Sequence, residues 1–190
     1  MPSIPARVAA VAERHPERVA IVADDRRIRY REFWSEARSF ALALRGRGLQ
    51  PGERVAILLP NRIEAAIACY GCWLAGGIAA PLNVQARARD FEVWLRHCDA
   101  RHIVYEHSHT DAIEAIAAVE ADDRRPPIER WPLGAEHTLA SHTGPAPADD
   151  ADIDNSVIDP NAIAPERDAL ILYTSGTTGA PKGVTLTDGS

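Results

Sequence analysis

In the first fifty residues, apolar side chains recur at the spacing of a helix in some segments and of a strand in others. Residues 5–14 predict a short helix, and residues 18–24 and 28–30 predict two short strands joined by a polar turn. A longer helix is predicted over 30–47, where Gly48 stands at the position of a C-terminal cap. Its apolar side chains recur at the helical spacing: Phe33, Ala37, Phe40, Ala41 and Leu44.

The next block predicts a strand, a helix and a second strand. Residues 53–60, ERVAILLP, contain the continuous apolar run VAILL, which suits a strand buried on both faces. A helix is predicted from Asn61 to about Ala75, with Asn61 and Glu64 as reciprocal N-terminal cap residues. The strand IAAPLN follows at residues 78–83.

The same alternation continues to residue 120. Residues 89–97 predict a helix, 102–106 a strand and 111–120 a helix. DALILYT, at 168–174, predicts a further buried strand, and GVTLT follows a Gly-rich loop. Strands that alternate with helices favour an α/β fold, with a mostly parallel sheet and helices on both faces.

One stretch breaks the alternation. No Lys or Arg occurs from Trp131 to Glu166, while Asp residues gather among Pro, Ala and Ser. We interpret this stretch as a surface connection, because a calcium loop would also need a Gly turn and a distal Glu. The predicted division is therefore an α/β subdomain at 1–140, an acidic connection at 141–166, and a strand–loop–strand unit at 167–190.

The charge and composition of the chain restrict the classes of partner and the locations that we expect for it. A net charge of -6 argues against nucleic acid as the main partner. Residues 65–82 are uncharged, but the glycines and proline within them favour a buried helix running into a strand over a transmembrane segment. The N-terminus lacks an apolar signal-peptide core, so the expected location is cytoplasmic. Oligomeric state receives no prediction.

The cysteines allow a second class of site. Cys69 and Cys72 form a CxxC pair, and with His97 and Cys98 they make a conceivable zinc set. The pair lies in the middle of a predicted apolar helix, where buried thiols are common. We therefore predict no metal site, and treat a zinc or redox protein as the less favoured alternative.

The loop between the last two predicted strands carries the strongest candidate chemistry. Its glycines allow main-chain N–H groups to converge on an anion, and its hydroxyls and Lys182 add donors. Lys182 is also the only Lys among 21 basic residues. A plain Gly/Thr hairpin turn is the alternative. The candidate phosphate-binding residues are Thr174, Ser175, Gly176, Thr177, Thr178, Gly179 and Lys182.

The loop sequence YTSGTTGAPKGV, from Tyr173 to Val184, resembles the phosphate-binding motif of the adenylate-forming superfamily. Three further segments resemble that family in the same order: RIRYREF, GLQPGERVAILLPNRIE and WLAGGIAAPLN. The resemblance implies the N-terminal part of the large domain of an AMP-forming acid ligase. The second and third of these segments look more like acyl-CoA synthetases than like peptide-synthetase domains.

The resemblance also implies a reaction in two halves. A carboxylic acid and ATP give acyl-AMP and pyrophosphate, and a thiol, usually coenzyme A, then takes the acyl group. The loop residues would surround the β- and γ-phosphates, with Mg²⁺ sharing their charge. No catalytic residue is assigned within the chain.

Two residues depart from the family pattern. Asp188 stands where the family commonly has His near the acyl site, so it could cap the following helix or alter the choice of acid. Arg29 replaces a Thr, which removes a helix cap and leaves catalysis untouched.

The family's acid pocket, adenine site, acidic Mg²⁺ ligand and C-terminal domain would follow Ser190. We therefore expect the 190 residues alone to form no acyl-AMP, which a pyrophosphate-exchange assay would contradict. Two alternatives remain open. One is a non-catalytic fragment that binds phosphate or a complementing partner, and the other is an aryl-acid ligase or a peptide-synthetase adenylation domain.

Overall fold

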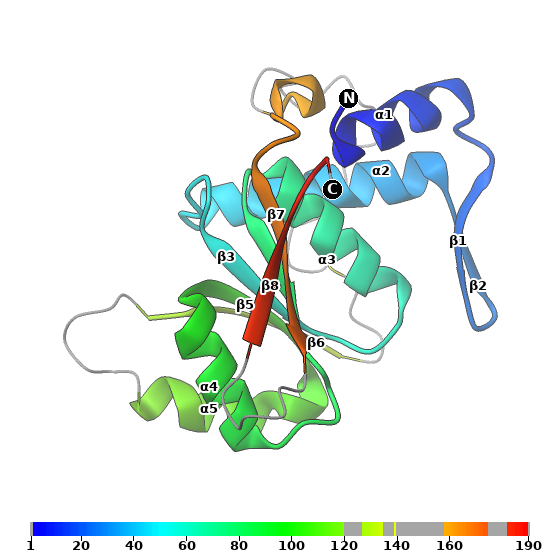
Figure 1. Cartoon of the computed structure of the whole chain (residues 1–190). Helices are drawn as coiled ribbons and strands as arrows, with labels where there is room; N and C mark the ends of the chain where they lie inside the picture. Colours follow the sequence, from blue (N-terminus) through cyan, green and yellow to red (C-terminus); the bar gives the residue numbers. More distant parts are fainter. Residues whose placement is uncertain (1, 120–126, 135–138, 140–157, 175–181, 190) are drawn as a thin grey trace.

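The computed structural model describes residues 2–119, 127–134, 139, 158–174 and 182–189. The first half contains α1 (Ile4–Arg14), β1 (Val19–Ala23), β2 (Arg26–Arg29), α2 (Tyr30–Gly46), β3 (Arg54–Leu58), α3 (Ile63–Leu74) and β4 (Ile78–Pro81). Next come α4 (Ala88–Cys98), β5 (Ala100–Glu106), α5 (Thr110–Val119), β6 (Glu129–Leu133), β7 (Asp168–Thr174) and β8 (Lys182–Thr187). Short 3-10 helices occupy His107–His109 and Pro160–Ala162. Figure 1 shows these elements in place.

The main sheet has the strand order β6-β5-β3-β4-β7-β8. Its first five strands are parallel to their neighbours, and only β8 runs antiparallel, beside β7. β1 and β2 form a separate antiparallel pair (Figure 1). The predicted α/β fold is therefore confirmed, as are the helix and strand assigned to residues 65–82. In the described ranges, no helix combines the length and the apolarity needed to cross a membrane.

Strand β3 has both faces buried, as its apolar run predicts. Val55 and Ile57 point into the core beneath α2 and α3, whereas Ala56 and Leu58 point into the core beneath α4 and α5. None of these four side chains is more than 2% exposed. Alternate residues of β3 thus pack against helices on opposite faces, so two helical layers enclose this strand.

The structure corrects the prediction of a surface connection beginning at Trp131. Trp131 lies on β6 with no exposed surface, and its ring meets Phe40 edge to face at 5.2 Å. Its Nε1 donates to His102 Nδ1 at 3.2 Å, and the Arg47 guanidinium lies 4.0 Å from its ring centre. The strand sequence ERWPL contains two charges and a Pro, so its local pattern did not reveal a buried strand. The three-part division of the chain stays a prediction.

The predicted cap of α3 is also wrong. The N-cap residue is Arg62, without a side-chain cap, and Glu64 instead accepts hydrogen bonds from Arg26 and Arg62, each at 2.7 Å. Burial opposes ionisation of Glu64, yet the two guanidinium groups outweigh it and hold its pKa below the usual value. The Glu64 carboxylate therefore pairs with two arginines instead of capping the helix. At α2, Arg29 provides no side-chain cap, as predicted.

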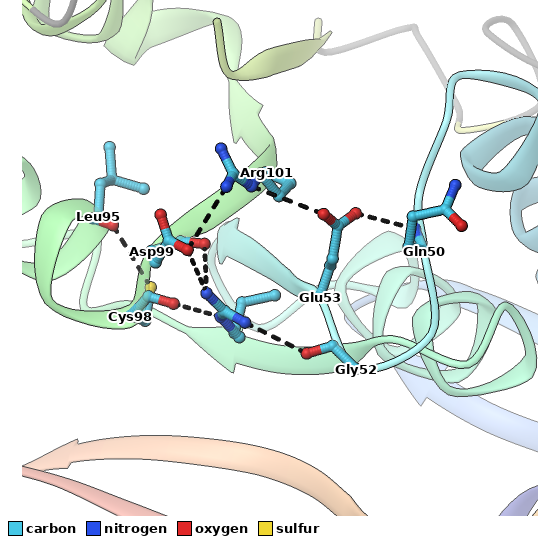
Figure 2. Close-up of polar contacts among 8 residues, drawn as sticks. Gln50, Gly52, Glu53, Leu95, Cys98, Asp99 and Arg101 are labelled. Atoms are coloured by element: carbon cyan, nitrogen blue, oxygen red, sulfur yellow. Dashed lines mark hydrogen bonds and ion pairs between the residues drawn. The ribbon is translucent and has the colours of Figure 1, made fainter. Parts of the chain in front are cut away.

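A polar cluster fixes the amino ends of β3 and β5 (Figure 2). Arg54 Nη2 lies 2.6 Å from Asp99 Oδ2, and Arg54 Nε donates to the carbonyl of Cys98 at the end of α4. Arg101 lies 3.6 Å from both Asp99 and Glu53. Asp99 adopts a left-handed conformation, with φ of 49°, as the chain turns from α4 into β5. Side chains of the two strands therefore hold this turn in place.

Candidate functional site

The candidate loop joins β7 to β8. The two strands pair antiparallel, and the register places Thr174 opposite Lys182, so the two ends of the loop lie side by side. The other candidate residues, Ser175, Gly176, Thr177, Thr178 and Gly179, lie outside the described residues. The strands do form a hairpin, and a hairpin that has a Thr and a Lys at facing positions on its two strands is compatible with phosphate binding. A Gly/Thr hairpin turn and a phosphate-binding loop, the two interpretations of this sequence, are therefore compatible with each other.

An aromatic cluster adjoins the start of the loop. The Tyr173 ring stacks on Trp94 of α4, with centres 5.7 Å apart and planes inclined by 30°. The Tyr173 hydroxyl oxygen lies 3.0 Å from His97 Nδ1 and donates to the Trp94 carbonyl oxygen at 3.3 Å. Burial is the largest cause that raises the pKa of Tyr173, so this phenol stays protonated at neutral pH. The sequence motif identified Tyr173, but nothing in it indicated the two α4 partners.

Asp188 anchors the opposite end of the hairpin. Its side chain has no exposed surface, and Oδ1 accepts the Ile4 N–H at 2.9 Å at the start of α1. Oδ2 lies 3.4 Å from Arg167, whose Nη2 donates to the Trp73 carbonyl at 2.7 Å. A carboxylate at a helix N-terminus is favoured by the helix dipole. Asp188 thus contacts the first helix of the chain, a position that neither of its expected roles foresaw.

The prediction that β7 is a buried strand is only partly correct. Ala169 is buried, but Leu172 is 39% exposed. Its register partner on β8, Val184, is 48% exposed. One face of the hairpin packs Ile171 and Tyr173 against the α4 and α5 core. An apolar run can therefore mark a strand without showing how many faces the described chain covers.

The three thiols are largely enclosed by the fold. Cys72 and Cys98 are buried, and Cys69 is half-buried. Burial raises the pKa of all three thiols, that of Cys69 to about 12. Within the ranges that the structure describes, no three His, Cys, Asp or Glu side chains are grouped as metal ligands.

Comparison with known proteins identifies a family and several relatives of the chain. Residues 8–190 match the family described as AMP-binding enzyme. The chain is 30% identical over 180 residues to 2-succinylbenzoate–CoA ligase of Bacillus licheniformis, covering 91% of this chain and 32% of the relative. It is 33% identical over 162 residues to a long-chain-fatty-acid–CoA ligase of Mycobacterium tuberculosis, covering 84% and 29% respectively. The chain thus spans about a third of the length of these relatives.

Solved structures agree with the sequence matches. The inhibitor-bound N-terminal domain of FACL13 from Mycobacterium tuberculosis superposes with a TM-score of 0.78 at 30% identity, over 99% of this chain and 45% of that one. ATP-bound MatB from Rhodopseudomonas palustris gives 0.78 at 27% identity, over 98% and 35%. With its α/β sheet and the motif between β7 and β8, the chain belongs to the AMP-binding enzyme family.

Proposed function

We propose that the chain supplies the pyrophosphate-side part of an AMP-forming carboxylic acid ligase. The observation that carries the proposal is the pairing of Thr174 with Lys182 across the ends of β7 and β8, within a chain of the AMP-binding family. A hydroxyl and an ammonium at the two ends of a Gly-rich loop suit the oxygen atoms of a polyphosphate. These two residues are proposed as phosphate ligands together with Ser175, Gly176, Thr177, Thr178 and Gly179.

In this proposal ATP transfers its AMP part to the acid, and the loop stabilises the pyrophosphate that departs. Positive charge and N–H donors that are in place before reaction lower the energy of the developing negative charge. Mg²⁺ is expected to enter with the phosphates. The acid would become an acyl-AMP and then pass to a thiol, with coenzyme A favoured because two relatives are named as CoA ligases.

The proposal concerns the chemistry that the relatives share. The two CoA ligases are named for different acids, and the chain is also 29% identical to N-(5-amino-5-carboxypentanoyl)-L-cysteinyl-D-valine synthase of Penicillium rubens. Similar identity to these proteins supports a carboxylic acid substrate and selects no single acid.

Pyrophosphate binding tests the loop directly. Lys182→Met should weaken binding of magnesium pyrophosphate by at least tenfold, because one charge-assisted contact contributes about 1.5–3 kcal/mol. Isothermal titration calorimetry measures the affinity. Arg27→Met, which removes an exposed cation on β2, is the matched control and should leave the affinity unchanged. Equal losses in both variants would show nonspecific attraction to positive charge and contradict the proposal.

The sequence offers a second readout. Because Lys182 is the only Lys, a chain labelled with lysine that carries 13C at Cε alone gives one side-chain signal, which comes from the end of the loop. Saturable movement of this signal with magnesium pyrophosphate is the expected result. A signal that stays still through the titration would count against Lys182 as a phosphate ligand.

A further inference from the structure

Tyr173 couples the loop to a helix that is distant in the sequence. It immediately precedes Thr174, the first residue of the proposed phosphate site. Its ring lies against two side chains of α4, stacked on Trp94 and edge-on to His97, with the centres of the latter pair 5.6 Å apart. A shift of α4 would therefore be felt at the residue that starts the loop.

The hydroxyl group fixes the direction of the Tyr173 ring. It lies 3.0 Å from His97 Nδ1 and 3.3 Å from the Trp94 carbonyl oxygen. When the hydroxyl donates to the carbonyl, the His97 tautomer with its hydrogen on Nδ1 donates to the Tyr173 oxygen. The hydroxyl is thereby held between a main-chain carbonyl and a side chain of α4. Stacking on Trp94 fixes the plane of the Tyr173 ring, and the two hydrogen bonds fix the orientation of the ring within that plane.

The returning strand meets the same cluster. Gly183 is the register partner of Tyr173 and immediately follows Lys182. A Cβ at position 183 would lie 3.0 Å from Ile171 Cγ2, 3.5 Å from Tyr173 Cε1 and 3.7 Å from His97 Cε1. A side chain at position 183 would therefore press on Ile171, which would have to move by a few tenths of an ångström. Both strands thus contact the aromatic cluster within one residue of the loop ends.

We propose that His97 and Trp94 are positioning residues for the phosphate loop, acting through Tyr173. This inference rests on the proposed function, since it assigns these residues to the geometry of the pyrophosphate site. His97 is exposed and lies outside the two buried cores, so its removal should affect the loop more than the stability of the fold.

The test compares the binding of magnesium pyrophosphate across a double-mutant cycle. His97→Ala and Tyr173→Phe should each weaken binding by threefold or more, and the double variant should lose little beyond the larger single loss. His97→Gln should recover part of the affinity, because its amide can donate to the Tyr173 hydroxyl. His15→Ala, at an exposed position after α1, is the matched control with no expected change. Urea unfolding of each variant separates lost affinity from lost stability.

Two results would overturn the inference while the proposed function stands. One is wild-type affinity in His97→Ala, and the other is losses in the two single variants that simply add. If the wild-type chain itself fails to bind pyrophosphate, the proposed function fails, and the 13C signal of Lys182 without ligand decides the positioning role. A shifted signal in both His97→Ala and Tyr173→Phe would support it, and an unshifted signal in both would refute it.

Discussion

Strands β3 and β7 belong to the same sheet but differ in how the described chain covers them. Helices lie over both faces of β3, and its apolar side chains are at most 2% exposed. On the β7–β8 hairpin, Ile171 and Tyr173 face a helical layer, whereas Leu172 and Val184 keep 39% and 48% of their surface exposed. The fold therefore concentrates its stability around β3 and places its candidate chemistry on the less covered hairpin.

The largest expected effect tests the β3 side of this comparison. Leu58→Ala should lower the free energy of unfolding by about 2–5 kcal/mol, because it removes a fully buried side chain and leaves a cavity. Urea unfolding followed by tryptophan fluorescence gives the value. A loss below about 1 kcal/mol would mean that β3 does not anchor the fold.

An intermediate effect concerns pH and the β5–β6 contact. Burial lowers the pKa of His102, while Glu129 and Glu53 oppose the shift and Arg47 adds to it, so the folded chain prefers the neutral ring that accepts from Trp131. An unfolded His binds a proton near pH 6.5. Stability from this group is thus complete above about pH 6.5 and falls as the pH drops through that value towards the lower folded pKa.

The variant His102→Gln isolates this contribution. Its amide oxygen can accept from Trp131 without titrating, so its unfolding free energy should fall less than that of the wild type between pH 7 and pH 5. Urea midpoints at several pH values measure both profiles. Parallel profiles would assign the acid sensitivity to other groups.

The smallest effect is expected on the exposed face of the hairpin. Leu172→Thr should change the free energy of unfolding by no more than about 0.5 kcal/mol, because the side chain is already partly in water and Thr suits a strand. The same urea experiment applies, with Leu58→Thr as the buried counterpart. A loss in Leu172→Thr comparable to that in Leu58→Thr would erase the contrast between the two strands.

Most of the helices and strands could be predicted from the sequence because the pattern of neighbouring residues specifies each of them. The helical spacing within 30–47 and the apolar run before Pro60 each specify an element from adjacent residues, and the motif identified the candidate loop residues. Strand β6 was missed because Trp131 is buried by Phe40, His102 and Arg47, which are far away in sequence. The contacts of Tyr173 with α4 join residues 76 and 79 positions apart, which no periodicity encodes.

The hydrogen bond between Ile4 and Asp188 spans 184 positions, so it also bears on the order in which the chain is made. A ribosome adding about 5–20 residues per second needs roughly 10 to 40 s to pass from one residue to the other. During that interval the first turn of α1 relies on the closer Ser3 hydroxyl, which accepts the Ala6 N–H. Helix α1 is thus completed by a residue 184 positions further along the chain, and its final docking has to wait until that residue has been made.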